Sequence, residues 1–120
     1  MAFKSKVSAN IGLVGSPTTI SDTVSAGFAQ TLIGLSLANT SSGNINVSVR
    51  LNKNGGSSSH LIKDATVLPG GALAVVGGDQ KVVLEQGDTI TAWSSAASSA
   101  DVVLSYLVDT NEEVSYGMGW

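Results

Sequence analysis

The single histidine and its neighbours offer the strongest chemistry in this chain. His60 follows the run Ser57–Ser59, and Asp64 lies shortly after it. A hydrolase would use these residue types, because a histidine oriented by a carboxylate can activate a serine nucleophile. However, the sequence has no G-x-S-x-G turn to present such a serine, and serine is frequent enough to lie beside any histidine by chance. We therefore predict no catalytic residues and no enzymatic activity.

The acidic residues offer a second chemistry, either the paired carboxylates of a glycoside hydrolase or a calcium site. All of them except Glu85 lie beside turn residues or at predicted strand ends, where carboxylates accept hydrogen bonds from backbone amides. No EF-hand calcium loop is present, and the ligands of a zinc site are missing. We therefore predict turn-stabilising roles, no metal and no cofactor. The residues considered are Asp64, Asp79, Glu85, Asp88 and Asp101.

Glycine pairs and one tryptophan are the remaining candidates for ligand binding. Gly70-Gly71 and Gly77-Gly78 would suit a phosphate loop, but no helix is predicted after either pair, so both are interpreted as turns. Trp93, at the end of a predicted strand, is the best candidate for a platform on which a sugar ring stacks. A tryptophan in this position more often belongs to the edge of a core or to a subunit interface. Carbohydrate or receptor binding is therefore the alternative function.

Composition favours a subunit that lies among neighbours. Charged residues make up 12% of the chain, against about 25% in an ordinary domain, and sparse charge favours association. The formal net charge is -3 and the six Lys and Arg residues are scattered, so nucleic-acid binding is not expected. The absence of cysteine excludes disulfides and thiolate chemistry. No apolar block of signal-peptide or membrane-span length is visible, so we expect neither export nor membrane insertion.

Aliphatic residues at every second position are the clearest structural signal. Ile45, Val47, Val49 and Leu51 alternate with polar residues, as in a half-buried strand. The range 101–108 is apolar on both faces, which predicts a strand covered on two sides. Further strands are predicted at 3–9, 18–24, 33–38, 60–63, 72–76, 81–84 and 89–93, separated by turns rich in Gly, Asn, Asp and Pro.

These short strands predict an antiparallel β-sandwich, jelly-roll-like, with about eight or nine strands. The interdigitated aliphatics expected to form its core are Ile33, Leu35, Leu37, Ile45, Val47, Val49, Val82, Leu84, Ile90, Val102 and Leu104. No stretch has a convincing helical period.

We expect a single β-sandwich domain over residues 1–108, followed by a C-terminal tail or docking arm over 109–120. The tail has apolar residues at alternating positions, including Tyr116, Met118 and Trp120. Such a peptide either adds a strand to a neighbour's edge and fills its pocket, or frays as chain ends do. Bulky apolar groups outside the core find their burial in partners, so Phe3, Trp93, Tyr116, Met118 and Trp120 are the predicted interface residues.

A resemblance to known proteins begins at IGLSLANTS, residues 33–41, and continues over 60–108. The second stretch includes LIKDATVLPGGALAVVGGDQKVVLEQGDTITAWSSAASSADVVLSYLV. This layout resembles small virion structural proteins of tailed bacteriophages, particularly those of cyanobacterial and marine phages.

The resemblance implies a non-enzymatic accessory subunit that assembles on a phage particle in the host cytoplasm. Its place would be capsid decoration or cement, or the neck, baseplate or tail fibre. The expected partners are copies of the chain itself, such as a trimer, and other virion proteins. A host surface glycan is the partner under the alternative function.

Overall fold

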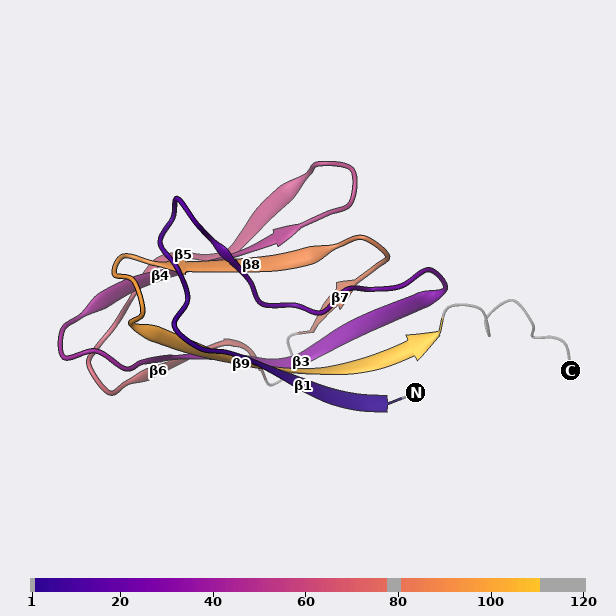
Figure 1. Ribbon diagram of the computed structural model, residues 1–120. Helices are drawn as coiled ribbons and strands as arrows, with labels where there is room; N and C mark the ends of the chain where they lie inside the picture. Colours follow the sequence, from indigo (N-terminus) through magenta and orange to yellow (C-terminus); the bar gives the residue numbers. More distant parts are fainter. Residues whose placement is uncertain (1, 78–80, 111–120) are drawn as a thin grey trace, which may run out of the picture.

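The computed structural model describes residues 2–77 and 81–110, which form an all-β sandwich of two antiparallel sheets (Figure 1). The strands in this part of the chain are β1 (Ala2–Ser8), β2 (Thr18–Thr19), β3 (Phe28–Asn39), β4 (Ile45–Asn52), β5 (Ser58–Val67), β6 (Ala72–Val76), β7 (Val82–Leu84), β8 (Thr89–Ser94) and β9 (Ala100–Thr110). The final strand extends past the predicted domain boundary at 108. The predicted interface residues Tyr116, Met118 and Trp120 lie outside the described residues.

The strand order is that of a jelly roll. The first sheet has the order β1-β9-β3-β6, and β7 also pairs with β3. The second sheet has the order β2-β8-β4-β5. Because β6 and β7 pair with successive parts of β3, they share one position in the first sheet. The pairs β1 with β9, β2 with β8, β3 with β6 and β7, and β4 with β5 are those of one long antiparallel hairpin rolled into two sheets.

The core lies between the two sheets and is built by the predicted alternation. The predicted residues that are buried there are Leu35, Leu37, Ile45, Val47, Val49, Leu84, Ile90, Val102 and Leu104. Val82 is partly buried and packs against them. Tyr106, Ile11 and Ile20 are also fully buried and belong to the same core. The period-two pattern thus places a dry aliphatic layer between the sheets.

The prediction that Ile33 belongs to the core is wrong, because β3 contains a bulge. Leu32 pairs with Tyr106 and Gly34 pairs with Ser105, so Ile33 is the extra residue in the register. A bulge shifts the side-chain alternation by one position. Before it, Gln30 and Leu32 are buried, and after it the odd-numbered residues are buried instead.

Two further expectations differ from the structure. The strand predicted over 18–24 pairs only at Thr18 and Thr19, after which the Ser21 hydroxyl accepts a hydrogen bond from the Ile90 amide and the chain leaves the sheet. The strand predicted over 101–108 is covered on one side by the chain itself. Val103, on its other side, keeps 46% of its surface exposed.

Val47→Asp should prevent folding, because Val47 is completely buried in the centre of β4. An unpaired carboxylate in that position costs several kcal/mol, against a total stability of about 5 to 15 kcal/mol for a domain. Circular dichroism and thermal melting would measure the loss. Leu68→Asp, a change to the same residue at a position that is 62% exposed, is the control and should melt close to wild type. A cooperative, near-native melt of the Val47 variant would contradict the assigned core.

Candidate functional site

The outer side of the first sheet carries exposed apolar side chains. Phe3 pairs with Leu107, and Val7 pairs with Val103, so their side chains form two rows across β1 and β9. The exposed fractions are 74% for Phe3, 68% for Val7 and 46% for Val103. Val83, on β7, continues the first row at 52% exposure. We call this surface the outer face of the first sheet; it lies on the lower side of the molecule in Figure 1.

The outer face is nearly free of charge. Between Asp101 and Asp109, at the two ends of β9, the outward-pointing residues within the described strands of this sheet are all uncharged, and the exposed Lys81 directly precedes β7. The outward-pointing residues are Phe3, Ser5, Val7, Ala29, Thr31, Ile33, Gly34, Ser36, Ala38, Ala72, Ala74, Val83, Val103, Ser105 and Leu107. Apolar surface without charge is what a protein normally covers with a partner.

The free edge of this sheet carries charged side chains, unlike its outer face. Among the described strands, β1 pairs only with β9, so its other edge is open. Lys4 and Lys6 alternate with the outward residues and point toward the inner side, where the Lys6 ammonium lies 3.1 Å from the Asp22 carboxylate. Inward charges on an edge strand discourage another strand from pairing with it. Association is therefore favoured at the outer face and disfavoured at this edge.

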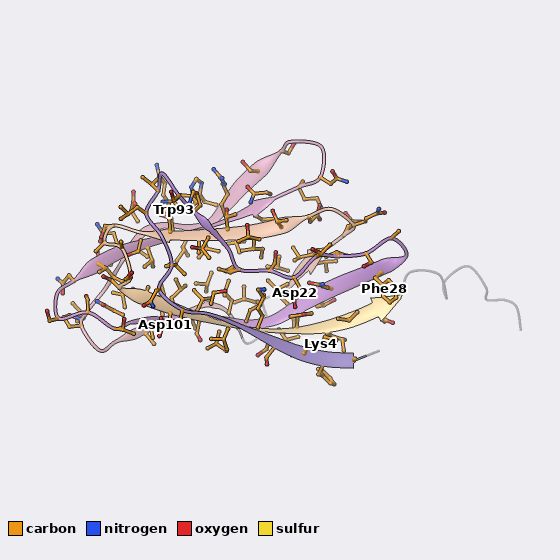
Figure 2. The ribbon with its side chains drawn as sticks, in the orientation of Figure 1. Lys4, Asp22, Phe28, Trp93 and Asp101 are labelled. Atoms are coloured by element: carbon orange, nitrogen blue, oxygen red, sulfur yellow. The ribbon has the colours of Figure 1, made fainter. Side chains whose placement is uncertain are left out.

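The structure separates the predicted interface residues Phe3 and Trp93. Phe3 lies on the outer face of the first sheet. Trp93 lies on the outward side of β8 in the second sheet (Figure 2). Trp93 is only 9% exposed. The Arg50 guanidinium lies 5.2 Å from the centre of its ring, and His60 packs edge-on with ring centroids 5.7 Å apart. A sugar stacks on the open face of an aromatic ring, and these contacts leave little of the Trp93 ring face exposed.

A pocket of about 410 Å³ adjoins this tryptophan. Its lining residues are Leu13, Val14, Asn46, Lys63, Asp64, Trp93, Ser94 and Ser95. The carboxylate of Asp64, considered above as the orienting group of a catalytic histidine, accepts a hydrogen bond from the Ser48 hydroxyl over 3.5 Å, and the Asp64 backbone amide donates to the same hydroxyl over 2.9 Å. The structure thus places His60 against an aromatic ring and Asp64 against a neighbouring strand, which is a packing arrangement.

Among the other acidic residues, Asp88 stabilises turns, as predicted. The buried Asp88 accepts hydrogen bonds from the Asn54 and Glu85 amides and from the Lys53 ammonium. Burial acts to raise the pKa of Asp88, but these hydrogen bonds outweigh it and lower the pKa below the ordinary value. Asp101 accepts from the Asn10 amide over 2.9 Å. Asp79 lies outside the described residues.

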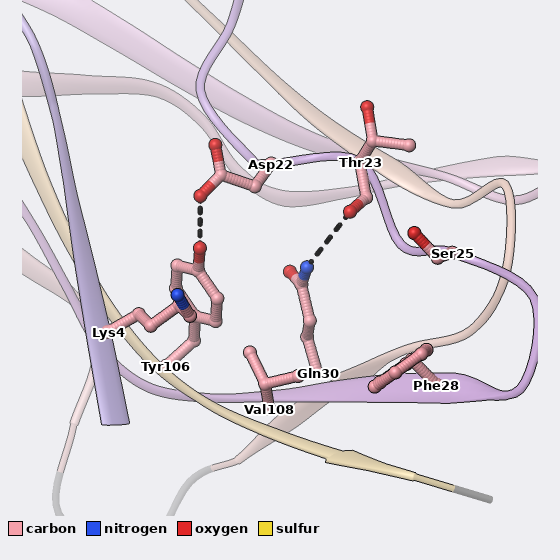
Figure 3. Close-up of a pocket in the computed structure, with 8 residues that line it drawn as sticks. All are labelled: Lys4, Asp22, Thr23, Ser25, Phe28, Gln30, Tyr106 and Val108. Atoms are coloured by element: carbon pink, nitrogen blue, oxygen red, sulfur yellow. Dashed lines mark hydrogen bonds between the residues drawn. The ribbon is translucent and has the colours of Figure 1, made fainter. Parts of the chain in front are cut away.

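A second pocket, of about 260 Å³, opens between the first sheet and the segment that follows β2 (Figure 3). It is lined by Lys4, Asp22, Thr23, Ser25, Phe28, Gln30, Tyr106 and Val108, and we call it the Gln30 pocket. At its base the Tyr106 hydroxyl donates a hydrogen bond to the Asp22 carboxylate. Asp22 and Tyr106 lie 84 residues apart in the chain, so no local pattern could have paired them.

Burial and the Asp22 carboxylate raise the pKa of Tyr106 to about 12. The same hydrogen bond, together with Lys6, lowers the pKa of Asp22 below its ordinary value. Both shifts favour the pairing of a neutral phenol with a charged carboxylate.

The comparisons with protein families and curated proteins gave no match to this chain. In the described part of the chain, no group of three or more His, Cys, Asp and Glu side chains is placed to hold a metal ion. Within the same residues, no helix has the length and hydrophobicity to cross a bilayer.

The Tyr106 pair predicts a stability loss at alkaline pH. The folded pKa of about 12 lies above the ordinary value of 10.0, so the stabilisation is present below pH 10.0 and is lost as the pH rises toward about 12. Tyr116→Phe leaves Tyr106 as the single tyrosine, whose ionisation can be followed by ultraviolet absorbance. Adding Asp22→Asn should lower the pKa of Tyr106 toward its ordinary value, because the carboxylate that raises it is removed. An ordinary tyrosine titration in the folded Tyr116→Phe protein would contradict the assigned hydrogen bond.

Proposed function

We propose that this chain is a non-enzymatic structural subunit of a tailed-phage particle and that it assembles through the outer face of its first sheet. The uncharged apolar surface around Phe3, Val7 and Val103 carries the proposal. Its first partner is a second copy of the chain, and the assembled copies then bind other virion proteins.

The lack of charge supports a second copy as the partner. A symmetric interface brings each residue close to its own counterpart or neighbours, so like charges would repel one another there. The outward residues between Asp101 and Asp109 avoid that repulsion, and their small side chains allow two sheets to pack face to face.

The size of the face supports the same conclusion. Its five strands have 38 residues, which rise about 3.3 Å each along strands about 4.8 Å apart, and this gives roughly 600 Å². A stable interface of standard size buries about 800 Å² on each partner. The outer face is therefore large enough to account for most of one such interface.

The jelly-roll order supports a role in a particle by analogy of fold, because this architecture recurs in viral capsid proteins as well as in lectin domains. The sequence resemblance to phage virion proteins points the same way.

Self-association should depend on the outer face. Light scattering coupled to size exclusion should give an oligomer for the wild-type chain and a monomer for Val103→Asp, because two carboxylates would be buried in the interface. Leu68→Asp, which charges an exposed leucine after β5, is the control and should keep the oligomeric mass. A monomeric wild-type protein, or an unchanged mass for the Val103 variant, would overturn this interface.

Incorporation into particles tests the biological role. Particles from an infected host are disrupted and their heads and tails are separated by sedimentation. The chain should then be found with the head fraction or with the tail fraction. The Val103→Asp variant, supplied in place of the wild-type chain, should be depleted from that fraction by about tenfold if the interface contributes about 1.4 kcal/mol or more. Absence of the wild-type chain from both fractions would refute the role in the virion.

A further inference from the structure

We propose that the Gln30 pocket binds a sugar ring, with a sugar hydroxyl donating a hydrogen bond to the Gln30 side-chain oxygen. This inference goes beyond the assembly role. The pocket lies on the inner side of the first sheet, so copies that meet through the outer face leave it open.

The buried amide of Gln30 carries the proposal. Gln30 is 3% exposed, and its Nε2 donates to the Thr23 carbonyl oxygen over 3.3 Å. Its Oε1 is buried and, among the described residues, accepts no hydrogen bond. Reversing the amide would set two acceptor oxygens against each other at Thr23, so this orientation is the favourable one. Native proteins rarely leave a buried acceptor unpaired, so a donor from outside the chain is expected.

The dimensions of the pocket fit one small ring. Its volume of about 260 Å³ is far more than the ~30 Å³ share of a single water molecule. It falls just below the range of about 300 to 1,000 Å³ that drug-sized ligands occupy. Phe28, which is 41% exposed, and Val108 give the pocket an apolar wall against which the C–H face of a sugar can pack.

The charges in the pocket select against cations. Asp22 already binds the Tyr106 hydroxyl and the Lys6 ammonium, and Lys4 lines the same space. A ligand that carried an ammonium group would meet these two lysines. An ionised carboxylate has no proton to donate to Gln30. A hydroxyl can donate to Gln30 and accept from Lys4, and neighbouring hydroxyls of a sugar ring provide both functions on one ligand.

An array of defined oligosaccharides, probed with the intact chain, would find the sugar. Titrations followed by NMR would then measure the affinity for methyl glucoside, methyl galactoside, N-acetylglucosamine and glucuronate. At least one sugar should bind. Gln30→Met, which keeps the side-chain volume and removes the acceptor, should weaken that binding about fivefold to tenfold.

Phe28→Ala removes the apolar wall of the pocket and should also weaken sugar binding. Because Phe28 is partly exposed, this variant tests the site even if Gln30→Met destabilises the fold. The matched control is Phe3→Ala, an exposed aromatic on the outer face that should leave sugar binding unchanged. The proposal is overturned if no sugar binds, or if binding survives Gln30→Met and Phe28→Ala and is lost in Trp93→Ala. The oligomeric mass reports the assembly role separately, so failure of one proposal does not imply failure of the other.

Discussion

The pairing of β3 with β9 through the bulge at Ile33 is the constraint on which the molecule depends. These two strands form the centre of the first sheet and pair from Phe28 with Thr110 to Asn39 with Ala100, with one register shift at Ile33. The bulge reverses which residues of β3 face the core. Leu35 and Leu37 fill the middle of the sandwich for this reason, and Gln30 turns inward at its open end.

The first sheet carries two different surfaces on its two sides. On the inner side, Gln30 and Tyr106 come together beneath the segment that follows β2 and line a pocket. On the outer side, Phe3, Val7 and Val103 form a surface without charge. Under the two proposals, neighbouring copies would contact the outer face while the Gln30 pocket stays open on the inner side.

The two sheets differ in how they meet solvent. The second sheet gathers charge on its outward side, where Arg50 and His60 enclose Trp93. Covering an aromatic ring with a cation and a second ring removes apolar surface that would otherwise favour association. Among the described residues, Phe3, Val7 and Val103 on the first sheet stay exposed. This asymmetry is why the proposed interface lies on the first sheet even though Trp93 is the larger aromatic residue.

Alternation of aliphatic residues along the sequence was sufficient to predict the sandwich, the position of β6 and most of the core, because side chains on successive strand residues point to opposite faces. It failed at Ile33, where one inserted residue reverses the pattern without any change in composition. The inward orientation of Gln30, the pairing of Asp22 with Tyr106 and the burial of Trp93 depended on tertiary structure alone. Each results from contacts between residues far apart in the chain, which only the packing of the two sheets brings together.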